Sequence, residues 1–438
     1  MTITYDPTHP NYFDEADLRG EMNRVYDLCH GCRLCFKYCT SFPTLFEIVD
    51  SKPDQAAHLM TPAEQDKVVD ECFQCKMCDI KCPYTPTQKH EWMLDFPRLM
   101  LRASAIRKTQ EGRKLPDHVF GNTDLLGRLN TLPGVSTVAN KMISSTESPV
   151  RKVLAKTLGI SSKRLLQPYA KTRFSTWFKR RSAPAIAKRQ GKVALFPTCL
   201  VEYQSPQIGK DLVGVYERNS VQCSLPEGMG CCGAPWLHSG DFENFREQAR
   251  KNIGPLSNAV KAGYDIVVPQ PTCGYVLKRD YADYFKGEPE LADAELIGAH
   301  TYDSSEYLWR IHKGEDTELD KNFTGHIPQT TSYHVACHLQ AQQIGLKSRD
   351  LMKLTGTKIT LVNQCSGIDG TWGYREANYD IAKQVAKPLG EAITRANAEV
   401  VTGDCHLANG AITEETGHIA LHPLSFMARA YGIPVDSR

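Results

Sequence analysis

The hydrophobic pattern of the chain changes near residue 191. From there on, short apolar runs alternate with longer amphipathic stretches, as expected of an α/β fold with buried parallel strands. Strands are predicted at 192–197, 266–269, 333–336 and 400–402, and helices between them at 241–252 and 378–397. Each predicted strand ends close to a cysteine, and open α/β sheets bind their ligands at the carboxyl ends of the strands.

Before residue 191 the pattern is helical. A helical stretch over 46–69 is predicted to be interrupted near Pro53 and Pro62, because proline cannot continue a helix. Residues 101–190 are predicted to form helices and turns, the clearest of them at 150–158. That helix places Val150, Val153, Leu154 and Leu158 on one face and Arg151, Lys152 and Lys156 on the other. Ser148 is expected to cap it, with Pro149 in its first turn and Gly159 beyond its end.

The composition is that of an ordinary globular protein with room for two or three domains. Of 438 residues, 41% are hydrophobic and 23% are charged. Residues 1–24 lack the basic and apolar regions of an export signal, and no apolar run reaches the length of about 18 residues that a membrane span needs. A cytoplasmic location is therefore expected, and in such a chain sixteen cysteines favour metal binding over disulfides.

The net charge of +2 hides an uneven distribution. Residues 101–190 carry 19 Lys and Arg against 4 Asp and Glu, a net charge of +15, which leaves −13 on the rest of the chain. Two interpretations are open: these basic side chains pack against the acidic remainder, or they form a surface that docks on anionic lipid headgroups or an acidic partner subunit. A nucleic-acid interface is not expected, because aromatic side chains are not interleaved with the charges.

Two cysteine runs of identical spacing occupy the first 100 residues. Cys29, Cys32, Cys35 and Cys39 are repeated as Cys72, Cys75, Cys78 and Cys82, the last followed by Pro83. In two-cluster ferredoxins with this spacing, the fourth cysteine of each run binds the other [4Fe–4S] cluster. The first cluster is therefore predicted on Cys29, Cys32, Cys35 and Cys82, and the second on Cys72, Cys75, Cys78 and Cys39. Thr40 stands where a proline is usual, which affects the path of the loop but not the number of ligands.

Zinc and haem account for these eight cysteines less well. Structural zinc uses four ligands, usually as two separated pairs, and would leave part of the set unexplained. Covalent haem requires a histidine directly after the second cysteine of a pair, and none is present. Two iron–sulfur clusters explain all eight positions.

The second half of the chain contains a cysteine repeat. Cys199, the pair Cys231-Cys232 and Cys273 form the first copy, and Cys337, Cys365-Ser366 and Cys405 form the second at nearly the same intervals. The duplication predicts two related halves facing each other across a pseudo-twofold cleft. The first set is predicted to hold a third metal site, and the second set a fourth.

Several neighbouring residues receive a different interpretation. Cys223 fits neither copy and is predicted to be a core thiol. His338 and His406 follow ligand-candidate cysteines directly, and they are the histidines to test as further ligands. The glycines of Gly228–Gly233 match a dinucleotide fingerprint by letter, but no clear strand leads directly into them, and two of the variable positions are cysteines.

Together these motifs resemble the heterodisulfide-reductase-related iron–sulfur proteins, and within them the C subunits of anaerobic glycerol-3-phosphate dehydrogenases. The resemblance also rests on the segments 95–99, 121–124, 269–275, 367–373 and 422–423. It implies an α+β multidomain protein with three parts: a helical two-[4Fe–4S] ferredoxin domain (1–100), a basic helical linker (101–190) and a duplicated Cys-Cys-Gly α/β domain (191–438, with repeats at about 191–290 and 330–438). It also implies an electron-transfer subunit between a flavin dehydrogenase and quinone, associated with the inner face of the membrane without spanning it.

The chain departs from that family pattern in the second half. Full Cys-Cys-Gly domains end in Cys-x-x-Cys, whereas Val276 and Ala408 occupy the last positions here, and Ser366 replaces a cysteine of the second pair. The first copy keeps four thiols, enough for one cubane cluster, and the second keeps three, with Ser366 or a histidine as the candidate fourth ligand. Zinc is the other metal that would suit these sites.

Three functions are therefore open. The first is an electron-transfer component that links a flavoprotein, or another redox protein, to a quinone or redox-protein acceptor. The second is a reductase that acts on a disulfide or a peroxide-type substrate at a cluster in the α/β cleft. The third is a docking platform stabilised by zinc. The metal content of the second half would distinguish them.

Overall fold

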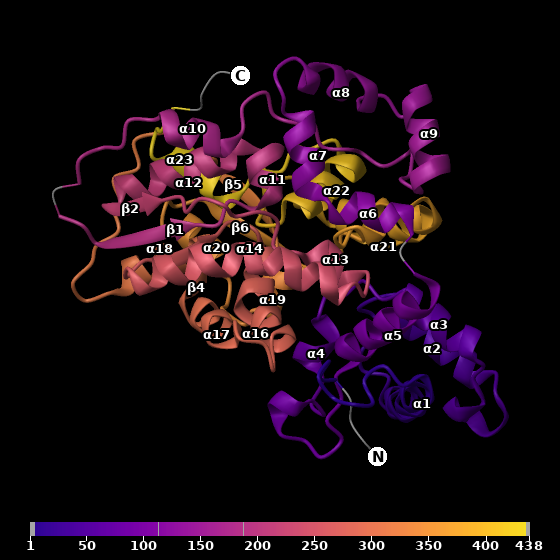
Figure 1. Ribbon diagram of the computed structural model, residues 1–438. Helices are drawn as coiled ribbons and strands as arrows, with labels where there is room; N and C mark the ends of the chain where they lie inside the picture. Colours follow the sequence, from indigo (N-terminus) through magenta and orange to yellow (C-terminus); the bar gives the residue numbers. More distant parts are fainter. Residues whose placement is uncertain (1–4, 113, 187, 435–438) are drawn as a thin grey trace. The chain divides into compact units, whose positions relative to one another are not determined.

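The computed structural model describes residues 5–112, 114–186 and 188–434, which are organised in two compact units (Figure 1). The first unit comprises Met1–His118 and Pro235–Arg246, and the second comprises Val119–Ala234 and Glu247–Arg438. The predicted α+β multidomain class is confirmed, since helices alone surround the first cysteine runs and parallel sheets occur in the second half. The predicted domain boundaries at residues 100 and 190 stay predictions.

The first unit is built from helices. They are α1 (Glu15–Cys32), α2 (Ser41–Asp50), α3 (Pro62–Asp70), α4 (Met77–Lys81) and α5 (Phe96–Glu111), with 3₁₀ turns at Pro53–Gln55, Ala57–Leu59 and Pro86–Gln88. The predicted interruptions near Pro53 and Pro62 are present, because α2 ends before Pro53 and Pro62 opens α3. Thr61 and Glu64 cap α3 reciprocally, which satisfies amide groups that have no partner within the helix.

One hydrophobic core holds the cysteine-bearing segments of the first unit. α1 contributes Met22 and Val25, α2 contributes Phe42, and α5 contributes Leu99, all of them buried. Cys29, Cys35, Cys39, Cys72, Cys78 and Cys82 belong to this core or pack against it. The loops that carry the cysteines are therefore held by packing on three helices.

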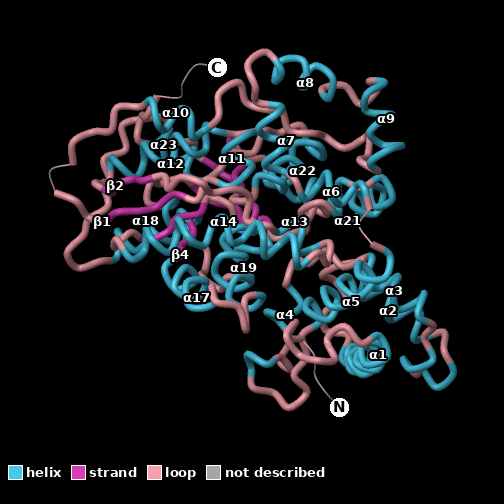
Figure 2. The backbone as a smooth tube through the Cα atoms, in the orientation of Figure 1, coloured by secondary structure: helices cyan, strands magenta, loops and turns pink. Residues whose placement is uncertain are grey.

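The second unit contains two parallel sheets (Figure 2). The first has the order β2-β1-β3-β4, with β1 (Gly191–Leu195), β2 (Val221–Ser224), β3 (Asp265–Val268) and β4 (Thr301–Asp303). The second has the order β6-β5-β7, with β5 (Thr330–His334), β6 (Lys358–Val362) and β7 (Val400–Gly403). In both sheets the first strand of the repeat lies between the second and the third, as expected if the two halves are duplicates.

Helices cover these strands and form the segment that precedes them. The helices before β1 are α6 (Leu115–Gly121), α7 (Thr123–Asn130), α8 (Val135–Ile143), α9 (Pro149–Leu158) and α10 (Phe174–Arg180). The first repeat and the segment after it contain α11 (Thr198–Tyr203), α12 (Pro206–Arg218), α13 (Ala234–His238), α14 (Phe242–Lys261), α15 (Pro271–Tyr275), a π-helix (Val276–Asp280), α16 (Tyr281–Tyr284), α17 (Leu291–His300) and α18 (Ser304–Lys313). The second repeat contains α19 (Cys337–Ala341), α20 (Lys347–Lys353), the 3₁₀ turns Trp372–Tyr374 and Glu376–Asn378, α21 (Tyr379–Ala396), α22 (His406–Thr416) and α23 (Pro423–Ala430). No helix in the described ranges is long and apolar enough to cross a membrane.

The strands predicted from apolar runs are present as β1, β3, β5 and β7, and the helix predicted at 378–397 is α21. The helix predicted at 241–252 is longer than expected, because α14 continues past Pro255 to Lys261. The predicted helix at 150–158 is α9, and Gly159 follows it with the expected left-handed backbone.

Two details predicted for α9 are wrong. Ser148 occupies the N-cap position, but its side chain makes no capping hydrogen bond. Burial does not follow the two predicted faces: Val153 of the apolar face is 58% exposed, whereas Arg151 of the basic face is 1% exposed. The reason is that the Arg151 guanidinium donates to the carbonyl oxygens of Ile143, Ser161 and Arg164, which closes the turn that follows the helix.

Candidate metal centres

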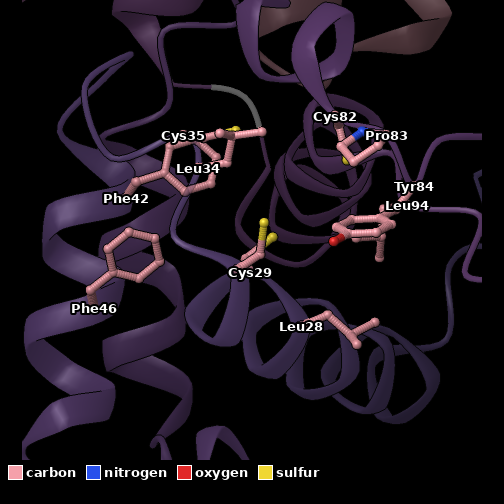
Figure 3. Close-up of a pocket in the computed structure, with 11 residues that line it drawn as sticks. Leu28, Cys29, Leu34, Cys35, Phe42, Phe46, Cys82, Pro83, Tyr84 and Leu94 are labelled. Carbon is pink, nitrogen blue, oxygen red and sulfur yellow. The ribbon is translucent and has the colours of Figure 1, made fainter.

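The first predicted ligand set lines one apolar pocket. Cys29 and Cys32 come from the end of α1, Cys35 from the loop after it, and Cys82 from the turn after α4. The other lining residues are Leu28, Leu34, Phe42, Phe46, Pro83, Tyr84 and Leu94. Figure 3 shows the rings of Phe46 and Tyr84 flanking Cys29. Apart from the sulfurs and the Tyr84 hydroxyl, the side chains that line this pocket are apolar.

The second predicted ligand set lines a second pocket of the same unit. Cys39 belongs to it together with Cys72, Cys75 and Cys78, so the two pockets exchange their fourth cysteines. The other lining residues are Tyr38, Phe42, Phe73, Gln74, Lys76, Phe96 and Pro97. The members of each pocket are the members of each predicted ligand set, although binding of iron by them stays a prediction.

The chemistry of both pockets suits a cationic metal group. Burial, with Cys82 and Cys32 adding to it, raises the pKa of Cys35 to about 12. Burial also raises the pKa of Cys29 and of Cys39. Thiols with raised pKa values lose their protons together only if a positively charged group stabilises the thiolates, and iron in a [4Fe–4S] cluster is such a group.

The turns between the cysteines use backbone conformations that the spacing did not reveal. Arg33 has a φ of 53° between Cys32 and Cys35, and Gln74 and Lys76 have φ values of 57° and 63° in the second run. Such left-handed residues reverse the chain sharply. The reversals allow three cysteines of each run to line one pocket.

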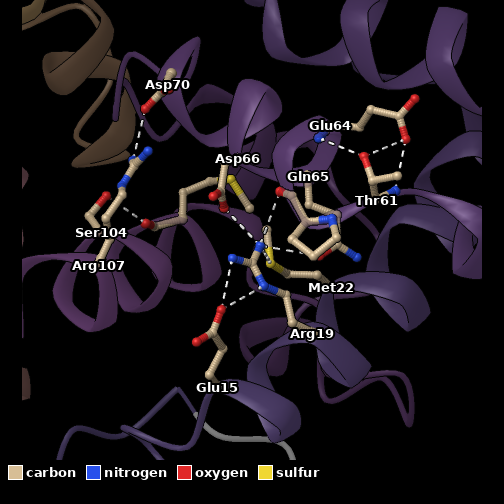
Figure 4. A network of polar contacts seen from close by, with 12 residues as sticks. Glu15, Arg19, Met22, Thr61, Glu64, Gln65, Asp66, Asp70, Ser104 and Arg107 are labelled. Carbon is tan, nitrogen blue, oxygen red and sulfur yellow. Dashed lines mark hydrogen bonds and ion pairs between the residues drawn. The ribbon is translucent and has the colours of Figure 1, made fainter. Parts of the chain in front are cut away.

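An ionic network fixes the helices behind these loops (Figure 4). Arg19 of α1 bonds Asp66 of α3 at 2.7 Å and Glu15 at 3.2 Å, while Arg107 of α5 bonds Asp70 of α3 at 2.8 Å. Arg102 of α5 is fully buried, and its guanidinium donates to backbone carbonyl oxygens before α1 and to a carboxylate oxygen of α1. These contacts tie α1, α3 and α5 together.

The third predicted site gathers four buried or half-buried thiols at the carboxyl ends of β1, β2 and β3. They are Cys199, Cys231, Cys232 and Cys273. Hydrogen bonding to Cys199 and Cys232 lowers the pKa of Cys231, whereas the same contacts raise the pKa of both neighbours. Cys273 contributes to the raised pKa of Cys232. The structure therefore brings this predicted set together, with Cys231 as the thiol most easily ionised.

Side chains of α7, α14 and α16 hold the backbone of the Cys231-Cys232 turn by hydrogen bonds. Asp124 of α7 accepts the N–H of Cys231 at 2.7 Å, and Asn252 of α14 accepts the N–H of Gly230 at 2.8 Å. The carbonyl oxygen of Cys231 accepts hydrogen bonds from Gln248 and Asn252, and that of Cys232 accepts one from Tyr281. Gly230 is required here, because an added Cβ would lie 2.3 Å from the Asp124 carboxylate.

The Thr123 hydroxyl also lies at this turn. It is close enough to Cys231 to hydrogen-bond the sulfur, and this contact contributes to the lowered pKa of that thiol.

The fourth predicted site is organised differently. Cys365 and Cys405 both have a pKa raised to about 11, mainly by burial, with Asp369 adding to the shift of each. Gln270, from the first repeat, donates to the Cys405 sulfur at 3.3 Å. Cys337 contacts the ring of His338, which also bonds Thr272 of the first repeat.

The other residues singled out in this half have the following surroundings, and their roles as ligands stay predictions. His406 lies 3.3 Å from the hydroxyl of Ser205, and burial lowers its pKa to about 4. Among the residues that the structure describes, no thiol contacts the side chain of Ser366. Cys223 lies on β2 in the hydrophobic core, as predicted. No three His, Cys, Asp or Glu side chains within residues 5–112, 114–186 and 188–434 have the arrangement of a site for a single metal ion.

The Gly228–Gly233 segment does follow a strand, contrary to expectation, since β2 ends at Ser224. The helix after it, α13, spans only Ala234–His238, too short for the long helix of a dinucleotide-binding unit. The segment serves instead to present the buried Cys231 and Cys232.

Residues of the expected linker bind a turn of the second repeat, Trp372–Tyr374, and the residue after it. Ile160 forms an antiparallel bridge with Arg375, and Ser161 donates its N–H to the Tyr374 carbonyl oxygen at 2.8 Å. Arg164 is buried, donates to the Gly373 carbonyl oxygen at 2.9 Å and pairs with Glu414 at 3.1 Å. Part of the basic segment thus packs on the acidic remainder, one of the two interpretations left open by the charge pattern.

Known proteins share this combination of parts. Residues 28–85 match the family model of a 4Fe-4S dicluster domain, and residues 193–278 and 331–408 match that of a cysteine-rich domain. The C subunit of the anaerobic glycerol-3-phosphate dehydrogenase of Escherichia coli K12 is 29% identical over 324 residues, which cover 72% of this chain and 77% of that protein. Lactate utilization protein A of Geobacillus kaustophilus is 30% identical over 237 residues, or 52% of this chain and 92% of the relative. The protein of that name from Geobacillus thermodenitrificans is 29% identical over 222 residues, or 49% of this chain and 87% of the relative.

Proposed function

The chain belongs to the family of iron–sulfur proteins that join a 4Fe-4S dicluster domain to a duplicated cysteine-rich domain, and we propose that it is the electron-transfer subunit of a dehydrogenase complex. The observation that carries this proposal is the exchange of fourth cysteines between the two pockets of the first unit. Because each ligand set contains cysteines from both runs, the two sets must lie next to each other. Neighbouring one-electron centres suit the passage of electrons better than the binding of a substrate.

In this proposal the first pocket provides Cys29, Cys32, Cys35 and Cys82, and the second provides Cys39, Cys72, Cys75 and Cys78. When bound, [4Fe–4S] clusters accept and release single electrons. Apolar side chains line much of each pocket, and the helices fixed by Arg19 and Arg102 keep the two loops in place. The electron donor would be a flavoprotein dehydrogenase and the acceptor a quinone or another redox protein.

The second unit would add a third metal group on Cys199, Cys231, Cys232 and Cys273. The dense hydrogen bonding of the Cys231-Cys232 turn supports this site, because a preorganised ligand loop loses little entropy when it binds metal. Cys337, Cys365 and Cys405 are the candidates for a fourth group, with Gln270 as a hydrogen-bond donor to the Cys405 sulfur.

A cytoplasmic protein at the inner membrane surface is the location we propose. Helices α7, α8 and α9 expose large apolar side chains: Leu125, Leu129, Val138, Met142 and Val153 are between 45% and 58% exposed. Arg128, Lys141, Lys152 and Lys156 lie on the same helices. Apolar side chains with basic neighbours suit insertion between anionic headgroups. Sedimentation with anionic vesicles tests this: Leu129→Ser with Val138→Ser should weaken binding, and equal binding by the variant would contradict it.

Metal analysis of protein purified without oxygen tests the main proposal. About eight irons with matching sulfide, plus a dithionite-reduced EPR spectrum of two interacting centres, are expected from the first unit alone. Additional iron that disappears in Cys231→Ser would support a redox group in the second unit, whereas zinc in its place would support a structural role. Fewer than about four irons per chain would refute the ligand sets built on the two cysteine runs.

A further inference from the structure

A buried lysine lies in the second pocket of the first unit. Lys76 stands between Cys75 and Cys78, and its side chain lines the pocket formed by Cys39, Cys72, Cys75 and Cys78. The residue is only 4% exposed. Its ammonium group donates to the Gln74 side-chain oxygen at 2.8 Å, and the Gln74 amide in turn donates to the Cys72 sulfur at 3.5 Å.

No carboxylate accompanies this ammonium group in the part of the chain that the structure describes. Lysine is almost never fully buried without an anionic partner. Removing its charge from water is costly unless an opposite charge compensates. The amide oxygen of Gln74 supplies one hydrogen bond but no charge. The charge partner of Lys76 therefore has to come from the pocket itself.

The first pocket offers a matched comparison. Arg33 occupies the equivalent position between Cys32 and Cys35 and has the same left-handed backbone, with a φ of 53° against 63° for Lys76. Its side chain is 45% exposed and pairs with Asp50 and with His30. It is absent from the pocket lining, which contains no charged side chain besides the cysteines. The two cysteine runs thus carry a cation at the same position, but only in the second run does its side chain line the pocket.

We propose that Lys76 is the buried counter-charge of the metal group held by Cys39, Cys72, Cys75 and Cys78, and that it gives this group the higher reduction potential of the two. The inference rests on the proposed ligand sets. Four thiolates give such a site a net negative charge, and each added electron makes it more negative. A positive charge in a pocket of low dielectric stabilises the reduced state and raises the potential, whereas the solvent-exposed, neutralised Arg33 does so far less.

This difference in reduction potential sets the direction of electron transfer between the two centres. An electron that reaches the first group is favoured to move to the second, which oxidises the first by one electron and reduces the second by one, without any change in bonds or protons. The outgoing partner would then collect electrons on the side of Cys39 and Cys72 to Cys78.

A redox titration of the full chain, purified without oxygen and followed by low-temperature EPR, tests the inference. Two midpoint potentials are expected in the wild type. Lys76→Met should move one of them to a lower value and leave the other in place, at unchanged iron content, and Lys76→Arg should restore it. Arg33→Met is the matched control and should leave both potentials unchanged. Cys75→Ser should alter the same signal that Lys76→Met shifts.

Unchanged potentials in Lys76→Met, or an equal shift in Arg33→Met, would overturn the inference while leaving the ligand sets intact. Should Lys76→Met lose iron, Lys76→Gln decides the question by the same readout, because it keeps a polar side chain of similar length without the charge. A wild type that binds fewer than about four irons per chain would refute the ligand sets and the inference with them.

Discussion

Removal of Asp124 should loosen the Cys231-Cys232 turn. The Asp124 carboxylate accepts hydrogen bonds from the Cys231 N–H at 2.7 Å, from Gln248 at 3.2 Å and from the Tyr203 hydroxyl at 3.3 Å. Cys231 is 2% exposed, so water cannot replace the lost acceptor. In Asp124→Ala the amide of Cys231 would remain buried without a partner.

The size of the effect follows from that amide. A buried donor left unsatisfied costs about 1–3 kcal/mol, and a hydrogen bond to a charged acceptor lies in the upper part of that range. Gln248 keeps a second acceptor, the Cys231 carbonyl oxygen. We therefore expect Asp124→Ala to destabilise the second unit by about 2–3 kcal/mol. Burial, with Cys231 adding to it, raises the pKa of Asp124, so the charge itself is unfavourable there, and Asp124→Asn should lose less.

Urea unfolding of the full chain, followed by a probe of the second unit, measures this difference. Iron or zinc retained after mild chelation reports on the site in the same samples. Glu147→Ala is the control: its side chain is 84% exposed, and it should stay within about 0.5 kcal/mol of the wild type. Equal stability and metal retention in Asp124→Ala and Glu147→Ala would refute the structural role of Asp124.

Three further predictions follow from buried groups. Arg102→Met should destabilise the first unit by about 3–5 kcal/mol, because it removes a buried guanidinium that binds the Asp17 carboxylate and the backbone carbonyl oxygens before α1, while the more exposed Arg98→Met should cost less than about 1 kcal/mol in the same thermal melt. Burial, with Asp404 adding to it, raises the pKa of Asp303 to about 7, above its value of about 3.9 in an unfolded chain. Its contribution to stability is therefore complete below about pH 4 and is lost as the pH rises through about 7; Asp303→Asn should flatten this decline in urea titrations, and an unchanged slope would argue against the shift. Cys223→Ala should retain the wild-type metal content, since this thiol lies in the core and away from the candidate ligands, and loss of metal would show otherwise.

The cysteine spacing predicted both groupings in the first unit because the ligand loops are local. Each run supplies three cysteines within seven residues, and only the fourth has to arrive from the other run. The burial of Lys76 and the exposure of Arg33 could not be predicted in the same way. Both residues occupy the same place in the spacing, and their side-chain directions depend on the packing of α2 and α5.

The strands missed from the sequence are β2, β4 and β6, and all three lie at the edge of a sheet. An edge strand has only one neighbour and needs less continuous apolar sequence: β2 alternates buried and half-buried residues, and most of β6 is exposed. Asp124 was missed for another reason. It lies 107 residues from Cys231, and no local pattern links positions so far apart.

The contacts of Asp124 and Arg164 determine how the protein can be divided. Both residues lie before residue 190, yet Asp124 holds the cysteine turn of the first repeat, and Arg164 holds the 3₁₀ turn Trp372–Tyr374 of the second, 209 residues away. A cut at 190 would separate each turn from its support, although it falls between a helix and a strand. An independently expressed cysteine-rich half should therefore begin before Val119, where the second compact unit begins. Exchange of this half between relatives should respect the same limit, because the segment from α7 to Arg164 makes contacts that support both repeats.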